Sequence, residues 1–331
     1  MEQRKDDHIS LALVSRTAPA LADPRFDYEP LLGVHPQGAD MPFPFLGKMM
    51  RVPVWVSSMT GGAREAGTIN RNLARACHEF GMGMGLGSCR ILLENPGHLA
   101  DFDLRGIIGT ELPFYANLGV VQVAEILERG ESSRLTDLVG MLQADGLIIH
   151  VNPIQEWLQP EGNRMTRLPV ETIGQLLDLT GLRIIVKEVG QGMGPASIAR
   201  LLALPVEGFE LAAFGGTNFA QVELARSTPS LRKLYEPLAM TGHTAGDMLA
   251  VVNALTREGH PVRCRHLIIS GGISTFLDGY YHISRSLLPA VYGQASAFLE
   301  HARGEYSVLR DFVSAHLDGL RFARAFLKIR T

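Results

Sequence analysis

The chain has 331 residues, of which 46% are hydrophobic, so it can bury one large core without disulfides or a structural metal. Its formal net charge of −3 gives no overall field that would attract nucleic acid or an anionic membrane, so an anionic ligand needs a local cluster of bases and backbone N–H groups. The cysteines, Cys77, Cys89 and Cys264, are odd in number and far apart, which argues against a disulfide framework and a zinc site.

The amino-terminal sequence is charged where a secretory signal would be apolar. It reads Met1-Glu-Gln-Arg-Lys-Asp-Asp-His8, and no run of about 18 apolar residues occurs anywhere in the sequence. We therefore expect a soluble, cytoplasmic protein.

Short apolar runs alternate with longer amphipathic segments along the chain, which is typical of strands separated by helices. The expected strands are, in chain order, Val54–Ser57, Met82–Leu86, Pro113–Asn117, Gly146–His150, Arg183–Lys187, Gly208–Ala212, Leu267–Ile269 and Ala290–Tyr292. The runs 147–149 and 184–186 are apolar at consecutive positions, which indicates burial on both faces, as in a parallel sheet covered by helices.

The intervening segments predict helices at Pro195–Leu204 and Ala245–Arg257, and a long polar loop around Ser227–Thr241, inserted after the sixth strand. Eight parallel strands favour a closed (β/α)₈ TIM barrel over an open doubly wound sheet, which usually has about five to seven strands. The length allows one or two domains. We predict a single barrel domain over residues 1–331, with residues 1–10 as an amino-terminal segment.

The residues that follow each expected strand are rich in glycine and polar side chains, and in such a barrel these positions carry the chemistry. Gly215-Gly216-Thr217, Ser270-Gly271-Gly272 and Gly293-Gln294-Ala295 follow the last three strands. Glycines there let the backbone approach a ligand and direct N–H groups at an anion, so we predict a phosphate site. An isolated Gly-Gly is more often an ordinary turn.

His150 and Lys187 each end a strongly apolar strand, where a buried ionisable group is costly unless it is paired or binds a ligand. A lysine at a barrel strand end is well placed to oppose a negatively charged flavin edge or a phosphate. The alternating glycines of 81–87 do not form a dinucleotide motif and indicate a tightly packed strand. Arg4 and Lys5 fit either a solvated terminus or a segment that binds an anionic ligand.

Several motifs, taken together and in order, resemble type 2 isopentenyl-diphosphate isomerase over nearly the whole chain. They are Arg4-Lys5-Asp6-Asp7-His8, Ser58-Met59-Thr60-Gly61-Gly62, Gly87-Ser88-Cys89-Arg90, Ala116-Asn117-Leu118-Gly119, His150-Val-Asn152-Pro-Ile-Gln155-Glu156, Gln159-Pro-Glu-Gly162 and Val186-Lys187-Glu188-Val-Gly190. The chain departs from the family pattern at Cys89, Asn163, Gly242–Ala245 and Ile273–Pro289.

The resemblance implies a (β/α)₈ flavoenzyme that interconverts isopentenyl and dimethylallyl diphosphate with reduced FMN and Mg²⁺, with NADPH as the reductant, and that forms a homo-oligomer. It implies flavin contacts from Ser58, Met59, Thr60, Ser88, Asn117, Lys187, Thr217, Gly271, Gly272, Gln294 and Ala295. It implies substrate contacts from Arg4, Lys5, Ser88, Arg90, His150, Asn152 and Gln155, with residues 1–10 covering the substrate. Gln155 and His150 are the implied catalytic residues and Glu156 the implied Mg²⁺ ligand.

Three alternatives stay open. An FMN-dependent hydroxy-acid oxidase or dehydrogenase uses the same barrel, but it needs a His base and an Arg after strands six and seven, where this chain has Gly215-Gly216-Thr217 and Ser270-Gly271-Gly272. A nucleotide dehydrogenase would use Cys89 as nucleophile. A flavin-binding relative without turnover would need none of Arg4, Lys5, Gln155 and Glu156.

Overall fold

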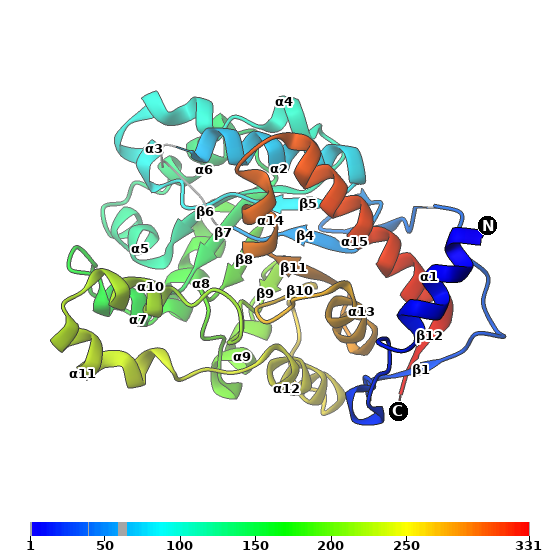
Figure 1. Cartoon of the computed structure of the whole chain (residues 1–331). Helices are drawn as coiled ribbons and strands as arrows, with labels where there is room; N and C mark the ends of the chain where they lie inside the picture. Colours follow the sequence, from blue (N-terminus) through cyan, green and yellow to red (C-terminus); the bar gives the residue numbers. More distant parts are fainter. Residues whose placement is uncertain (1, 39, 59–64, 331) are drawn as a thin grey trace.

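Eight parallel strands form a closed barrel in the computed structural model, which describes residues 2–38, 40–58 and 65–330 (Figure 1). The barrel strands are β4 Val54–Val56, β5 Gly83–Gly85, β6 Phe114–Gly119, β7 Gly146–His150, β8 Ile184–Lys187, β9 Gly208–Glu210, β10 His266–Ser270 and β11 Ala290–Gln294. Each corresponds to one expected strand, with ends that differ by two residues or fewer. The predicted (β/α)₈ barrel is therefore confirmed.

The strands follow one another around the barrel in chain order, and β11 closes it against β4. The register places Gly119 of β6 beside His150 of β7, His150 beside Lys187 of β8, and Lys187 beside Glu210 of β9. Because neighbouring positions on parallel strands point to the same face, the ionisable side chains at these strand ends meet at one end of the barrel.

Helices surround the barrel and pack on the outward faces of its strands. Their bounds are α1 Glu2–Ala12, α2 Ala66–Phe80, α3 Arg90–Glu94, α4 Arg105–Ile108, α5 Val120–Glu128, α6 Ser133–Met141, α7 Pro153–Leu158, α8 Pro169–Thr180, α9 Pro195–Leu202, α10 Phe219–Arg226, α11 Pro229–Ala239, α12 Ala245–Arg257, α13 Phe276–Arg285, α14 Ser296–Ala302 and α15 Tyr306–Phe326, with 3₁₀ turns at Pro19–Leu21 and Pro96–Asp101. The helix predicted at Ala245–Arg257 is confirmed, and the one predicted at Pro195–Leu204 ends at Leu202.

The expected loop around Ser227–Thr241 is wrong, because α11 occupies most of it. The Thr228 side chain accepts a hydrogen bond from the Leu231 N–H, and Pro229 stands in the first turn, where it costs no backbone hydrogen bond. The apolar residues of this helix are largely exposed, and Pro237 lies inside it, so the sequence pattern of a buried helix face is weak. Helix α11 packs against α10 and leaves a small apolar cluster beside α7.

A short hairpin closes the amino-terminal end of the barrel. It consists of β2 Phe43–Phe45 and β3 Lys48–Met50, and its side chains join Trp55, Tyr115 and other inward residues in one buried cluster. The Arg183 guanidinium, just before β8, donates to the Leu46 carbonyl, and Lys48 Nζ pairs with Asp145 just before β7 at 2.6 Å. Hairpin and inward strand residues thus fill the barrel interior at this end with apolar side chains.

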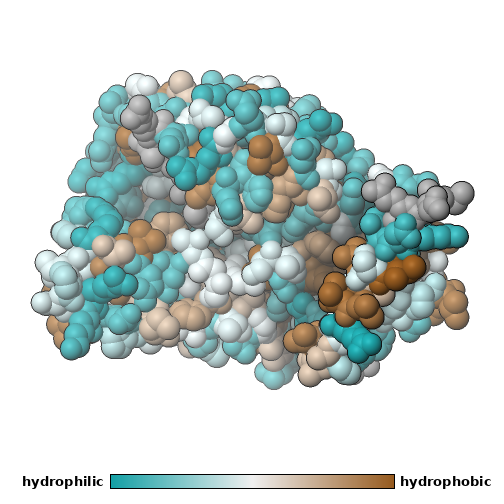
Figure 2. All heavy atoms as spheres, viewed as in Figure 1, coloured by the Kyte–Doolittle hydropathy of each residue, from teal (hydrophilic) through white to brown (hydrophobic). Residues whose placement is uncertain are grey.

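The two ends of the chain meet on the opposite side from the strand-end loops. Strand β1 Phe26–Tyr28 pairs antiparallel with β12 Leu327–Ile329, and α1 lies beyond them, far from α7, α10 and α11 (Figure 1). Exposed apolar side chains, including those of Ile9, Leu13 and Val14, gather on this amino-terminal segment (Figure 2). No helix in the described part of the chain is long and apolar enough to cross a membrane.

Candidate active site

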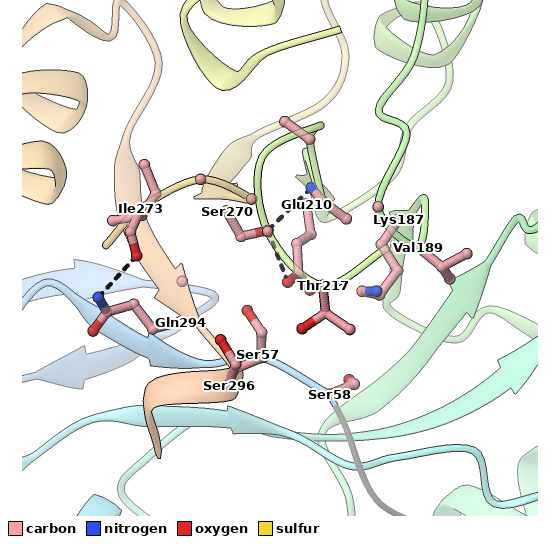
Figure 3. Close-up of a pocket in the computed structure, with 18 of the residues that line it drawn as sticks. Ser57, Ser58, Lys187, Val189, Glu210, Thr217, Ser270, Ile273, Gln294 and Ser296 are labelled. Carbon is pink, nitrogen blue, oxygen red and sulfur yellow. Dashed lines mark hydrogen bonds between the residues drawn. The ribbon is translucent and has the colours of Figure 1, made fainter. Parts of the chain in front are cut away.

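A pocket opens at the carboxyl ends of the strands, with an empty volume of about 520 Å³ that includes its solvent-open mouth (Figure 3). It is lined by Ser57, Ser58, Lys187, Val189, Gly190, Glu210, Ala212, Ala213, Gly216, Thr217, Phe219, Ser270, Gly271, Gly272, Ile273, Gly293, Gln294, Ala295 and Ser296. Seven of the residues that the sequence predicts for a flavin are in this set. They are Ser58, Lys187, Thr217, Gly271, Gly272, Gln294 and Ala295.

Four polar atoms on the pocket wall are buried and have no hydrogen-bond partner within the described chain. They are Ser57 Oγ, Ser58 Oγ, Glu210 Oε2 and Gln294 Oε1. A buried polar atom without a partner costs about 1–3 kcal/mol, and native proteins keep few of them. Their concentration around one pocket therefore indicates a polar ligand with several hydrogen-bonding groups.

Two glycine-rich turns form one wall of the pocket and pack backbone to backbone. A Cβ added at Gly271 would lie 2.1 Å from the Ala213 carbonyl oxygen, and one at Gly216 would lie 3.2 Å from the Gly271 Cα. Gly271 also has a φ of 88°, which side-chain-bearing residues rarely adopt. No larger residue fits at Gly271, so the close approach of these two turns depends on glycine there.

Lys187 ends β8 and is buried in the pocket wall. Its Nζ donates to the Glu188 carbonyl oxygen at 2.8 Å, and no described carboxylate forms an ion pair with it. The Glu188 carboxylate turns away and accepts from the N–H groups of Gly190, Gln191 and Gly192 at 2.7, 2.6 and 3.0 Å. Burial raises the pKa of Glu188 against the opposing effect of these donors. Glu188 thus shapes the loop after β8 and leaves the Lys187 charge to a ligand.

His150 is held in one tautomer by Asn117. The Asn117 Nδ2 donates to the Leu86 carbonyl oxygen at 2.9 Å, so its Oδ1, 2.7 Å from His150 Nδ1, must accept the Nδ1 proton. Burial, reinforced by the nearby Lys187 ammonium, lowers the pKa of His150 to about 3. His150 is therefore neutral at neutral pH, and its Nε2 presents a lone pair. Asn117 does not line the pocket; it orients His150.

Three residues that follow β7, Asn152, Gln155 and Glu156, form a hydrogen-bonded group around the start of α7. Asn152 Nδ2 donates to Gln155 Oε1 at 3.0 Å and to Glu156 Oε1 at 3.3 Å, while the backbone N–H of Asn163 donates to Glu156 Oε2 at 2.8 Å. Asn152 and Glu156 are both buried. The structure therefore brings together the three residues predicted here for substrate and metal.

Glu223 on α10 joins this group, and the sequence analysis missed it. Gln155 Nε2 donates to Glu223 Oε1 at 3.3 Å, and Arg226 Nη1 donates to Glu223 Oε2 at 2.7 Å. Glu223 is buried, although it lies in an amphipathic segment with an ordinary charge pattern. Helix α10 belongs to the connection after β9, and it places Glu223 beside Gln155, which follows β7. This position, and no sequence pattern, distinguishes Glu223 from a surface glutamate.

The oxygen atoms of Asn152 and Glu156 are ligands that a hard cation such as Mg²⁺ prefers, but they are too few to complete its coordination shell. Among the described residues no group of three or more His, Cys, Asp or Glu side chains could hold a metal ion. However, Asn152 Oδ1 is buried without a partner beside the Glu156 carboxylate. Mg²⁺ keeps several waters and often takes one or two protein oxygens plus substrate phosphates, so this donor set fits it when a phosphorylated ligand completes the shell.

Two further predicted residues, Ser88 and Arg90, do not line the pocket. Ser88 and Arg90, after β5, are exposed, and Arg90 Nε lies 3.4 Å from Glu94. Between them Cys89 is buried, and burial raises the pKa of its thiol to about 12, so it is not a nucleophile. Met59 and Thr60 lie outside the described residues.

Arg4 and Lys5 are exposed on α1, at the opposite end of the molecule from α7 and α10 (Figure 1). The chain in this conformation does not bring them to the pocket, because β1 anchors the amino-terminal segment to the carboxyl terminus. Covering the substrate with residues 1–10 therefore requires the segment to leave this position, or to reach the site of another copy.

A wider hollow lies outside the barrel between α8 and α9, with an empty volume of about 1600 Å³. Its lining includes Met165, Leu168, Ile173 and Met193, and none of its residues has a buried side-chain polar atom without a partner. The smaller strand-end pocket is thus the better site for a polar ligand.

Comparisons with known proteins agree with this geometry, although no protein-family model matches the chain. The isopentenyl-diphosphate delta-isomerase of Rickettsia felis is 33% identical over 334 residues, covering 99% of this chain and 93% of the relative. The enzyme of the same name from Rickettsia typhi is 31% identical, covering 96% and 91%.

Solved structures share the fold. A double mutant of flavocytochrome b2 with pyruvate bound has a TM-score of 0.63 at 14% identity, covering 91% of this chain and 71% of that one. A mutant mandelate oxidase with a monooxide FMN adduct has a TM-score of 0.55 at 12% identity, covering 92% and 88%. At these identities the likeness concerns the barrel alone.

Proposed function

The chain belongs to the isopentenyl-diphosphate delta-isomerase family, and from this premise we propose that it interconverts isopentenyl diphosphate and dimethylallyl diphosphate with reduced FMN and Mg²⁺. The strand-end pocket is the observation that supports flavin binding. In its wall, four buried polar atoms lack hydrogen-bond partners, and they lie near glycine turns and near Lys187, which has no carboxylate partner within the described chain. FMN has a ribityl chain with hydroxyl groups and a terminal phosphate, and these groups can form hydrogen bonds and ion pairs with the polar atoms of the pocket wall.

In this proposal the glycine turn after β10, Gly271-Gly272, holds the phosphate of FMN together with Gln294 and Ala295 at the end of β11. Lys187 opposes the anionic N1–O2 edge of the ring, and Ser58 and Thr217 contact the ring and ribityl chain. When bound, the reduced flavin supplies a proton donor and acceptor beside the alkene. The remaining tasks, which are to orient the substrate and shield it from water, belong to the protein side chains.

His150 and Gln155 are the proposed catalytic residues on the substrate side. Neutral His150 offers its Nε2 lone pair and adds no positive charge that would oppose cationic character at the tertiary carbon. Gln155 is held between Asn152 and the Glu223 carboxylate, which gives it a polar link to a group that can accept a proton. Asn152 fixes Gln155 and Glu156 together.

The diphosphate is proposed to bind where positive charge can gather. Glu156 and Asn152 Oδ1 hold Mg²⁺, and Arg90 and Ser88 lie exposed and accessible at the end of β5. Arg4 and Lys5 would add two more cations once the amino-terminal segment moves over the site.

Hydroxy-acid oxidation is the second candidate, because the solved relatives with this fold include flavocytochrome b2 and mandelate oxidase. That chemistry needs a base and a carboxylate-binding arginine after the sixth and seventh strands. The pocket lining from these strands and the loops after them consists of Glu210, small residues, Thr217, Phe219 and Ile273, with neither histidine nor arginine. We therefore favour isomerisation.

The deciding experiment uses purified protein. Its absorption spectrum shows whether flavin is bound, and proton exchange into isopentenyl diphosphate, with dithionite and Mg²⁺ present, shows whether the allylic proton moves. We expect a yellow protein that exchanges protons only when reduced. Oxidation of a 2-hydroxy acid without such exchange would instead establish the second candidate.

We further propose that NADPH reduces the flavin and that the protein is a cytoplasmic homo-oligomer. All three cysteines are free, which suits a reducing compartment, and the exposed apolar residues of 9–34 offer a surface for a second copy. Anaerobic bleaching of the flavin by NADPH and sedimentation of the purified protein test these two points.

A further inference from the structure

Glu210 is a buried carboxylate in the pocket wall that the motifs do not account for. Its side chain is fully buried on β9, between Lys187 of β8 and the strand that leads to Gly271 and Gly272 (Figure 3). Its Oε1 accepts a hydrogen bond from Ser270 Oγ at 3.1 Å, and its Oε2 has no partner within the described chain.

The hydrogen bond that Glu210 Oε1 accepts from Ser270 has a structural role. Ser270 Oγ also accepts the Ala212 N–H at 3.0 Å, and Ala212 has a φ of 41°, an uncommon conformation for a residue other than glycine. Glu210 thus supports, through Ser270, the turn that lines the pocket. This support uses one carboxylate oxygen only.

Glu210 Oε2, in contrast, has no structural role of this kind within the described chain. A buried carboxylate with one hydrogen bond is unfavourable, and among the described residues no cation forms an ion pair with it, although Lys187 is its neighbour in register. Both side chains face the same pocket. A ligand there must supply an anionic edge to Lys187 and a hydrogen-bond donor to Glu210.

We propose that Glu210 positions the cofactor, with Oε2 accepting a hydrogen bond from a ribityl hydroxyl of FMN; this rests on the proposed function. The phosphate is excluded as the partner because it is an anion. The ribityl chain is the part that joins the ring, opposite Lys187 on β8, to the phosphate at the turn after β10 and the end of β11. It must therefore pass β9, and its hydroxyls are O–H donors.

The test measures the Kd of flavin-free protein for FMN and for FMN analogues lacking one ribityl hydroxyl each, by quenching of flavin fluorescence. Wild type should bind one analogue at least about tenfold more weakly than FMN, since hydrogen bonds to charged groups are the strong ones. Glu210→Gln should bind FMN about tenfold more weakly than wild type and should bind that analogue within about threefold of FMN.

Ser270→Ala is the matched control, because it removes the support of Ala212 but keeps the Glu210 charge and Oε2. It should lower the melting temperature of the flavin-free protein and retain discrimination against the same analogue. If Glu210→Gln does not fold, Glu210→Asp, whose oxygen is withdrawn from the pocket, replaces it in the same comparison.

Two results would overturn the proposal. One is a Glu210 variant that discriminates among the analogues as wild type does, which would leave Glu210 a purely structural residue. The other is wild-type protein that binds FMN but no analogue more weakly. Wild-type protein that binds no FMN at all would overturn the proposed function as well, so the two failures are distinguishable.

Discussion

At the residue scale, burial decides which groups of the site are charged. His150 ends β7 and Cys89 precedes α3, and in both burial favours the neutral form, lowering the pKa of the imidazole and raising the pKa of the thiol. Glu156 keeps its hydrogen-bond donors within its own loop. These environments assign different roles to residues that look equally reactive in the sequence.

Replacing Glu156 by Gln should weaken Mg²⁺ dependence and substrate binding together, because an amide oxygen is a poorer ligand for a hard cation than a carboxylate. The flavin spectrum should stay normal, since Glu156 does not line the flavin pocket. Mg²⁺ titration of the isomerase activity is the measurement. Glu171→Gln, an exposed change on α8, is the control; an unchanged titration in Glu156→Gln would remove Glu156 from the metal site.

Replacing Gln155 by Ala should lower kcat by about 10²-fold with little change in the Mg²⁺ requirement, if Gln155 takes part in proton transfer. Glu223→Gln should lower kcat in the same way, because Glu223 holds Gln155 through a 3.3 Å hydrogen bond. Steady-state kinetics at saturating Mg²⁺ give both values. Full kcat in Gln155→Ala would show that it only fills space beside the substrate.

Neutral His150 predicts a pH dependence of stability. Its folded-state pKa of about 3 lies below the ordinary value near 6.5, so between these values the unfolded chain binds a proton that the folded chain does not. The free energy of unfolding should therefore fall as pH is lowered from about 6.5. Urea unfolding of flavin-free protein at pH 7 and pH 5 should show a smaller loss in His150→Gln than in wild type. His243→Gln, at an exposed site, should behave like wild type.

At the scale of elements, the loops that follow the barrel strands form the candidate site, and the β2–β3 hairpin, which precedes the first barrel strand, covers the opposite end of the barrel. The β2–β3 hairpin fills the amino-terminal end, while α7, α10 and the glycine turns stand at the other. Helix α1 belongs to neither group, since it is exposed and lies at the far end of the molecule. The role proposed for it in covering the substrate therefore requires that it move or that it reach the site of another copy.

Deleting residues 1–8 should raise KM for the diphosphate by at least about 30-fold, because two cations that contact a diphosphate are worth at least ~2 kcal/mol together. Flavin affinity and the melting temperature should not change, since these residues are exposed and outside the pocket. The double variant Arg4→Ala, Lys5→Ala in the full chain removes only the two charges, so comparison with the deletion distinguishes their effect from that of the rest of the segment. Unchanged KM in both variants would make Arg4 and Lys5 a solvated terminus.

At the scale of the whole molecule, one barrel carries both the strand-end pocket proposed for the flavin and the residues proposed for the substrate. The strand-end pocket is bounded by the glycine turn after β10 and by the end of β11, where the proposed site holds a terminal phosphate. In the proposed function, Mg²⁺ and a few local cations neutralise the diphosphate in a chain whose net charge is −3. A global field is not needed for binding.

The released cofactor should therefore be FMN and not FAD, which mass spectrometry of the heat-denatured protein will show. FMN should also stabilise the fold by about 2.7 kcal/mol at a free concentration of 100 times its Kd, because it binds only the folded state. Thermal unfolding with FMN, and with riboflavin as the phosphate-free control, measures this. Equal stabilisation by riboflavin would mean that the glycine turns hold no phosphate.

The sequence by itself determined the barrel, because the barrel strands are buried on both faces along almost all of their length and most of them therefore appear as short apolar runs between helices. It also placed Lys187, Gly271 and Gln294 at strand ends, which in this topology share one pocket. It could not show α11, whose apolar side chains are mostly exposed, or the position of α1. The tertiary structure alone decided that Glu210 and Glu223 are buried beside the site, because burial depends on contacts between strands and helices distant in sequence. For the same reason it alone decided that His150 is neutral, since its charge state is set by its surroundings and the Lys187 ammonium.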